Sequence, residues 1–298
     1  MSADLLVAGA GGQVGREAAR LAAAAGMQVA AFDRAALDVT DADAVARAME
    51  AAAPKVVVNA AAYTAVDAAE DDADAAFAIN RDGAANIASA ANAVGAQVIH
   101  LSTDYVFDGR KAGTYVEDDV TAPLGVYGAS KLAGEEAVAA RAPRHVILRT
   151  SWVYGVQGRN FVRTMLRLGA ERDALRVVDD QTGCPTYAAD LAEAIVILAA
   201  RLEKGGAGPD GYGVFHCAGA GVTTWRRFAE RIFHLSAPMT GRSPRVEPIR
   251  TADYPTPAAR PANSALDCGR LARVHGIALR PWPEALADML AAELATSG

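Results

Sequence analysis

Leu5-Leu6-Val7-Ala8-Gly9-Ala10-Gly11-Gly12-Gln13-Val14-Gly15, near the amino terminus, is the stretch that decides the fold. Four apolar residues predict a buried strand, and the glycines after them predict a tight turn into a helix. The glycines permit the turn, a close approach of backbone to a pyrophosphate, and tight helix–strand packing. The helix start adds free N–H groups and a positive dipole end. The predicted cofactor contacts in this loop are Gly9, Gly12, Gln13, Val14 and Gly15.

Apolar strand candidates alternate with helical segments from this loop as far as Thr150. This rhythm predicts a doubly wound α/β fold of the Rossmann type, in which helices cover both faces of a parallel sheet. Beyond Thr150 the rhythm loosens, and Ala237–Ala262 carries six prolines. We therefore expect a smaller, discontinuous C-terminal substrate domain. The predicted ranges are 1–150, 170–180 and 186–218 for the dinucleotide-binding domain, and 151–169, 181–185 and 219–298 for the substrate domain.

Composition narrows the class of protein. The chain has 298 residues, is 52% hydrophobic and carries a net charge of −6, and no basic cluster indicates a nucleic-acid partner. No uninterrupted apolar run reaches membrane-spanning length, and no signal peptide is evident. Cys184, Cys217 and Cys268 lack metal-ligand spacing, which favours reduced thiols. We expect a cytoplasmic protein without a nucleic-acid or membrane partner.

The residues after the second predicted strand bear on the choice of cofactor. Asp33 at this position would accept hydrogen bonds from the adenosine ribose, which favours NADH. Arg34 beside it could pair with a 2′-phosphate, which favours NADPH. The sequence leaves the two cofactors open. Asp38 and Val39, in the same loop, are further predicted cofactor contacts.

A tyrosine and a lysine are spaced for carbonyl–alcohol redox chemistry. Tyr127 and Lys131 are four residues apart in a predicted helix and so lie on one face. A cation beside a tyrosine stabilises the phenolate and lowers the pKa of the hydroxyl, which can then protonate a developing alkoxide. Thr103 ends the fourth predicted strand, at the sheet edge where ligands bind. We predict that Thr103, Tyr127 and Lys131 are catalytic, with Tyr127 and Lys131 also contacting the cofactor.

Taken together, these motifs resemble the extended short-chain dehydrogenase/reductase family. Within it, the chain is similar to the branch that reduces dTDP-linked 4-keto-6-deoxy sugars. The resemblance runs over almost the whole chain and is much more specific than the glycine loop. The motifs that carry it are Gly9–Glu17, Asn59–Asp67, Ser102–Gly109, Tyr127–Lys131, Arg149–Tyr154, Asn160–Phe161, Asp180–Thr186 and Arg260–Ser264.

The resemblance implies hydride transfer from NADPH or NADH to C4 of dTDP-4-dehydro-L-rhamnose, giving dTDP-L-rhamnose, with Tyr127 as proton donor. It also implies a homodimer. Cofactor contacts implied by it are Ala62, Tyr63 and Thr64. Substrate contacts implied by it are Thr103, Asp104, Trp152, Asn160, Arg260, Asn263 and Ser264. Some family members hold Mg²⁺ between subunits through three glutamates, which here correspond to Glu17, Asp190 and Glu293.

Two other functions remain open at this point. The first is a nucleotide-sugar epimerase, dehydratase or other reductase of the same fold. A dehydratase of that branch would follow its Thr-Asp pair with Glu, whereas Asp104 is followed here by Tyr105. The second is a non-catalytic regulatory subunit, since relatives of this branch serve as binding partners of an enzyme. An intact Thr, Tyr and Lys set argues against that role.

Overall fold

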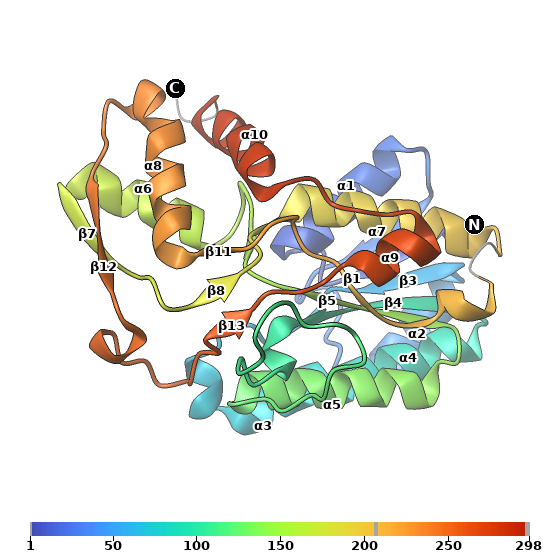
Figure 1. Ribbon diagram of the computed structural model, residues 1–298. Coiled ribbons are helices and arrows are strands. Elements are labelled where there is room, and N and C mark those ends of the chain that lie inside the picture. Colours follow the sequence, from blue (N-terminus) through green and yellow to red (C-terminus); the bar gives the residue numbers. More distant parts are fainter. Residues whose placement is uncertain (1, 206–207, 296–298) are drawn as a thin grey trace.

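The chain folds around a parallel six-stranded sheet, as the computed structural model of residues 2–205 and 208–295 shows (Figure 1). The ends of the predicted domain ranges at residues 1 and 296–298 lie outside these described residues. In spatial order the strands are β10 (Gly213–His216), β5 (His145–Thr150), β4 (Gln97–Thr103), β3 (Val56–Asn59), β1 (Leu5–Ala8) and β2 (Val29–Phe32).

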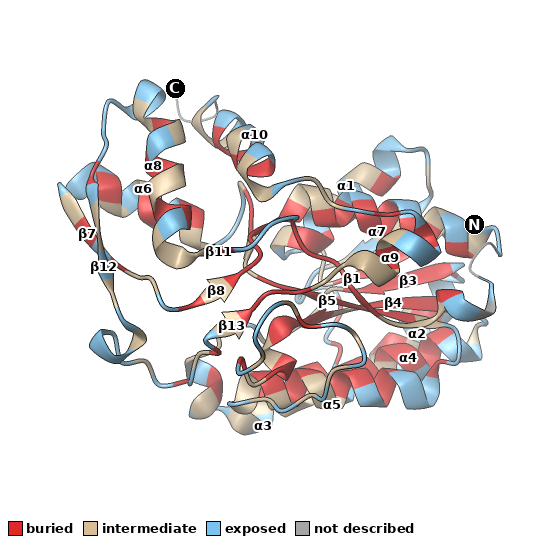
Figure 2. Ribbon diagram, viewed as in Figure 1, coloured by how far each residue is buried: buried red, intermediate tan, exposed pale blue. Residues whose placement is uncertain are grey.

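Helices cover both faces of this sheet, which confirms the predicted doubly wound fold. Figure 2 shows the central strands buried between the two helical layers. Along β1, Leu5 and Val7 pack into one apolar cluster and Leu6 and Ala8 into the other, because successive side chains point to opposite faces. One layer contains α1 (Gln13–Ala24), α7 (Ala188–Glu203) and α9 (Gly269–His275), and the other α2 (Ala42–Ala52), α4 (Ala84–Ala93) and α5 (Val126–Arg141).

The sheet reverses its direction of growth at β1, which lies between β2 and β3. The connections after β1 and β3 therefore leave in opposite directions and open a crevice at the carboxyl ends of the strands. In open α/β sheets, ligands bind at such a switch point.

A second lobe is built from later parts of the chain. Its apolar core includes Phe228, Ile232 and Leu286, and it lies at one end of the sheet (Figure 1). Its main elements are α6 (Phe161–Glu171), β7 (Ala174–Val178), α8 (Trp225–Thr240), β12 (Arg245–Ile249) and α10 (Trp282–Ala295). Short strands join the lobes: β11 (Thr223–Thr224), β8 (Thr182–Gly183), β13 (Asn263–Ser264), β6 (Val153–Tyr154) and β9 (Thr186–Tyr187).

The structure corrects the predicted division of the chain in two places. Residues 170–180, expected in the dinucleotide-binding domain, contribute β7, which pairs with β12 in a separate two-stranded sheet. The reason is burial, since Leu175 and Val177 enter the core of the second lobe. Conversely, α9 falls within the range expected for the substrate domain, yet Leu271 packs into the core beneath the large sheet.

Short helical segments complete the described structure. Residues 73–93, which carry three consecutive helical elements, are interrupted by a π-helical turn, and such turns are frequent at functional sites. Among the described residues, no helix is long and apolar enough to span a membrane. The remaining elements are η1 (Ala68–Glu70), α3 (Ala73–Phe77), the π-helical η2 (Ala78–Gly83), η3 (Asp104–Val106), η4 (Pro209–Gly211) and η5 (Thr251–Asp253).

Candidate active site

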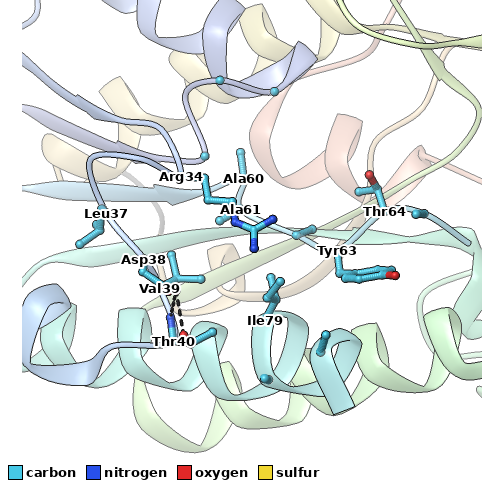
Figure 3. A pocket seen from close by; sticks show the side chains of 17 residues that line it. Arg34, Leu37, Asp38, Val39, Thr40, Ala60, Ala61, Tyr63, Thr64 and Ile79 are labelled. Carbon is cyan, nitrogen blue, oxygen red and sulfur yellow. Dashed lines mark hydrogen bonds between the residues drawn. The ribbon is translucent and has the colours of Figure 1, made fainter. Parts of the chain in front are cut away.

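A cavity of about 610 Å³ opens at the β1/β3 switch point (Figure 3). Its walls come from the loop after β1, the loop after β2 and the connection after β3, as the fold requires of a dinucleotide site. The residues lining it are Gly9, Gly11, Gly12, Arg34, Leu37, Asp38, Val39, Thr40, Ala60, Ala61, Ala62, Tyr63, Thr64, Ala65, Ala75, Ala78 and Ile79.

Close packing explains two of the glycines in the loop. A Cβ on Gly9, whose φ is +83°, would lie 2.5 Å from the backbone nitrogen of Ala61. A Cβ on Gly15 would lie 2.3 Å from the carbonyl oxygen of Gly9. Gln13 and Val14 are not in the cavity wall: the Gln13 side chain accepts a hydrogen bond from another part of the chain, and Val14 is buried in the core.

Asp33 and Arg34, which favour NADH and NADPH respectively, have different surroundings. The Asp33 carboxylate accepts hydrogen bonds from the backbone N–H groups of Ala35 and Ala36, at 3.0 and 2.9 Å, and does not line the cavity. Arg34 is exposed and lines the cavity beside Asp38 (Figure 3). Asp38 bonds to Thr40, which lowers the pKa of its carboxyl group. The Arg34 cation, but not the Asp33 carboxylate, therefore faces the cavity.

Thr103 and Tyr127 meet beyond this cavity. Thr103 ends β4, Tyr127 lies in the first turn of α5, and the two side chains are close enough for Thr103 to lower the pKa of the Tyr127 hydroxyl. The helix comes close to this edge of the sheet because residue 128 is glycine: a Cβ there would lie 2.2 Å from the carbonyl oxygen of Tyr105. The ring of Tyr105 packs edge-on against Tyr127, with centroids 5.5 Å apart.

Lys131 is buried one turn further along α5. Its ammonium donates a hydrogen bond of 2.6 Å to the carbonyl oxygen of Leu101. Burial lowers the pKa of Lys131 to about 8, against a smaller opposite effect of Glu135. A lysine with this pKa changes charge just above neutral pH.

The prediction that Lys131 lowers the pKa of Tyr127 is wrong. Burial raises the pKa of Tyr127 to about 12, the neighbouring Thr103 hydroxyl opposes this rise, and the charge of Asp104 adds to it. Desolvation of the phenolate is the largest effect on this pKa. At neutral pH the side chain is therefore a neutral phenol with a proton to give.

Asp104 is a second buried acid at the same edge. Its oxygen Oδ1 accepts a hydrogen bond of 2.9 Å from Thr103, whereas Oδ2 is buried without a hydrogen-bond partner among the described residues. Ser264 and Thr103 lower the pKa of this carboxyl group, but burial dominates and raises the pKa of Asp104 to about 6. Ser264, predicted from the resemblance, therefore lies near the end of β4.

Trp152 lies at the junction of the two lobes. Its φ of +47° is unusual for a residue with a side chain, and such backbone strain clusters at functional sites. The indole stacks on Trp225 with centroids 3.5 Å apart, and it covers Gly183, where a Cβ would lie 2.3 Å from the ring. The strain is thus held by packing on both sides.

Asparagine and arginine side chains predicted to contact substrate already have protein partners. Asn160 caps α6, and its amide group donates a hydrogen bond of 2.9 Å to the Gln13 side chain. Arg260 pairs with Asp67 across the two lobes at 2.7 Å. Asn263 holds the loop at residues 111–113, and its amide oxygen accepts from Thr182 and Ala265. A direct contact of Asn263 with substrate would require several of these bonds to break.

The sequence interpretation missed a link between the cavity wall and the catalytic helix. Asn80 is buried in the π-helical turn. Its side chain accepts a hydrogen bond of 2.8 Å from the backbone N–H of Tyr63 and donates one of 2.9 Å to the hydroxyl of Ser130. Ser130 lies between Tyr127 and Lys131. The sequence interpretation also missed a buried ion pair in which Arg149 contacts both carboxylate oxygens of Glu135. Isolated buried polar residues carry no spacing signal that would have identified them.

The three acids proposed for Mg²⁺ do not form a site in this chain. Glu17 and Glu293 each pair with a neighbouring arginine, and Asp190 accepts two hydrogen bonds of 2.9 Å from Arg280. Residues 2–205 and 208–295 hold no group of three or more His, Cys, Asp or Glu side chains placed to bind a metal ion. The magnesium expectation is therefore not supported, because arginines already neutralise the carboxylates.

Comparisons with known proteins agree with this geometry. The family described as "RmlD substrate binding domain" matches residues 3–295. A dTDP-4-dehydrorhamnose reductase from Sinorhizobium fredii is 47% identical over 280 residues, which is 94% of each chain. A crystal structure of dTDP-4-dehydrorhamnose reductase from Clostridium acetobutylicum superposes with a TM-score of 0.89 at 40% identity, covering 97% of this chain and 98% of that one.

A further solved structure contains a cofactor. The dTDP-4-dehydrorhamnose reductase from Bacillus anthracis, in complex with NADP, superposes with a TM-score of 0.90 at 36% identity. The match covers 98% of this chain and 100% of that chain. Similarity of this extent, over both lobes and the site between them, shows the family. The chain belongs to the family of dTDP-4-dehydrorhamnose reductases.

Proposed function

We propose that the protein reduces the 4-keto group of dTDP-4-dehydro-L-rhamnose to give dTDP-L-rhamnose, with NADPH as reductant. The observation that carries the proposal is the Thr103–Tyr127–Lys131 set, placed beside a dinucleotide cavity in a member of this family. NADPH bound in the cavity supplies the hydride, and the protein supplies orientation and the proton.

The cofactor fits the residues that line the cavity. Gly9 and Gly12 leave room for the pyrophosphate, and Arg34 is placed to pair with a 2′-phosphate. The connection Ala60–Ala65 would run along the cofactor. Lys131 would turn from the Leu101 carbonyl to the nicotinamide ribose.

The proton follows a short path. Tyr127, a neutral phenol, donates its proton to the sugar oxygen as negative charge develops there. Thr103 would turn its hydroxyl from Asp104 to donate a hydrogen bond to the same oxygen and so stabilise the charge. Asp104 and Ser264 would hold a hydroxyl group of the sugar, and Trp152 would form a wall of its pocket.

The rival functions make different predictions in one assay. We expect the purified protein to consume one NADPH for each dTDP-4-dehydro-L-rhamnose reduced. An epimerase or dehydratase would convert a dTDP-hexose without net consumption of NADPH. A regulatory binding subunit would show no substrate-dependent loss of NADPH absorbance.

Cofactor preference gives the first prediction. Arg34→Ala should weaken NADPH binding about 10- to 100-fold and leave NADH binding nearly unchanged, because a charge-assisted bond to phosphate contributes about 1.5–3 kcal/mol. Fluorescence titration with both cofactors measures this. Arg47→Ala, at an exposed arginine of α2 outside the cavity wall, removes the same charge and serves as control. Equal weakening of both cofactors would contradict the assignment.

The pH dependence gives the second prediction. Because burial places the pKa of Lys131 at about 8, the ammonium is lost as pH rises through that value. We expect kcat/KM, which reports the free protein, to fall above about pH 8. Lys131→Arg should move this alkaline limb upward, since guanidinium stays charged. A limb that stays in place in this variant would show that another group titrates.

We also propose that the protein works as a homodimer in the cytoplasm. The homodimer rests on the family resemblance. The cytoplasmic location rests on the cysteines, which form no disulfide among the described residues. Light scattering on the purified protein tests the oligomeric state.

A further inference from the structure

The catalytic helix α5 begins without a cap of its own. Its N-cap residue is Gly125, which has no side chain to accept a hydrogen bond from the first turn. That turn carries Tyr127, one residue from the helix start. Uncapped helix ends fray, because the first N–H groups lack partners within the helix. Precise placement of the Tyr127 hydroxyl therefore needs a partner from elsewhere in the chain.

Glu70 is that partner. Its carboxylate oxygen Oε1 accepts a hydrogen bond of 2.9 Å from the backbone N–H of Val126, the first residue of α5. The two residues are 56 positions apart in sequence. A carboxylate at this end of a helix also interacts favourably with the helix dipole.

The glycine at the N-cap makes room for this carboxylate. Gly125 has a φ of −144°, an extended conformation open to any residue, so backbone freedom does not require glycine there. A Cβ at this position, however, would lie 2.4 Å from Oε1 of Glu70. Space for the Glu70 carboxylate is the steric reason for a glycine before the catalytic helix.

Glu70 is itself held in place by the connection that leads to it from β3. This connection begins at the cofactor cavity, where Ala60–Ala65 form part of the wall. It is then tied to the second lobe, where Asp67 pairs with Arg260 at 2.7 Å. Glu70 follows at the end of η1. The carboxylate is thus presented by a segment anchored on both sides of the crevice.

We propose that Glu70 is a positioning residue for Tyr127: by capping α5 from the connection after β3, it holds the Tyr127 hydroxyl in register with Thr103. The inference rests on the proposed function, because it concerns the proton donor of that reaction. Glu70 acts through the helix backbone and does not touch the reacting atoms. Small displacements of a proton donor cost far more in rate than in binding.

The test compares four single variants and one double variant in steady-state kinetics with NADPH and dTDP-4-dehydro-L-rhamnose. Glu70→Ala should lower kcat about 10-fold or more, with KM for the sugar nucleotide and the Kd of NADPH changed less than about twofold. Glu70→Gln should recover most of the rate, since its amide oxygen can still accept the hydrogen bond. Asp71→Ala, at the exposed neighbouring acid, should behave as wild type.

Gly125→Ala provides the second arm, because its Cβ displaces the carboxylate without removing it. We expect its kcat to fall as in Glu70→Ala, and the double variant to be no worse than Glu70→Ala, since the two changes break one contact. Additive losses would overturn the proposal. So would a rate for Glu70→Ala equal to that of Asp71→Ala, or a Glu70→Gln variant as slow as Glu70→Ala.

A readout independent of activity separates this proposal from the proposed function. Hydrogen exchange at the amide of Val126 should be faster in Glu70→Ala than in wild type, while amides in the centre of α5 keep their protection. If the wild-type protein lacks reductase activity but this exchange result holds, the proposed function fails and the cap stands. Unchanged exchange at Val126 in Glu70→Ala would overturn the cap itself.

Discussion

Replacing Tyr127 with phenylalanine is expected to lower kcat by about 10²- to 10⁴-fold, the range usual for loss of a general acid. The ring and its edge-on packing against Tyr105 remain, and only the proton donor is lost. The Kd of NADPH should therefore stay close to the wild-type value. Single-turnover kinetics and a fluorescence titration of NADPH measure the two quantities separately.

Tyr254→Phe is the matched control for this change. Tyr254 is 61% exposed, so removal of its hydroxyl should leave kcat unchanged. A Tyr127→Phe variant with wild-type turnover would remove Tyr127 from the mechanism. A variant that lost NADPH binding together with turnover would instead indicate a binding role.

The second large effect is expected at Gly9. Gly9→Ala should destabilise the fold by about 2–5 kcal/mol, because it adds left-handed strain of about 1–2 kcal/mol to overpacking of about 1–3 kcal/mol. The new Cβ would lie within 2.7 Å of three backbone atoms of Ala60 and Ala61. It would push two walls of the cavity apart, so NADPH affinity should fall more than about tenfold.

Gly26 separates the two contributions. Its φ is +85°, close to that of Gly9, but a Cβ there would meet nothing within 4 Å. Gly26→Ala should therefore lose about 1–2 kcal/mol in urea unfolding and keep its affinity for NADPH. If Gly9→Ala and Gly26→Ala lose the same stability and both bind NADPH normally, the close packing at Gly9 has no role in the site.

Local patterns predicted the parts of the fold and site that short segments determine. The glycine loop, the parallel sheet and the placement of Tyr127 and Lys131 on one helix each depend on residues within one turn or one strand–helix unit. The family assignment was likewise carried by contiguous motifs. For these features, spacing in sequence corresponds directly to spacing in the molecule.

Features that depend on distant partners escaped prediction. The strand at 174–178 pairs with residues 245–249, and neither segment has a sequence pattern that predicts this partner. Asn160 and Asn263, expected at the substrate, use their amides to hold backbone and loops. The pKa of Tyr127 depends on how deeply the phenol is buried, so its direction could not be read from the position of Lys131 alone.

Transfer of label from cofactor to sugar tests the central claim most directly. The protein is mixed with dTDP-4-dehydro-L-rhamnose and NADPH carrying deuterium at the transferable position of nicotinamide C4. The account predicts one deuterium per product molecule, located at C4 of dTDP-L-rhamnose by NMR. Product without deuterium at C4, or a converted sugar with no oxidised cofactor, would contradict it.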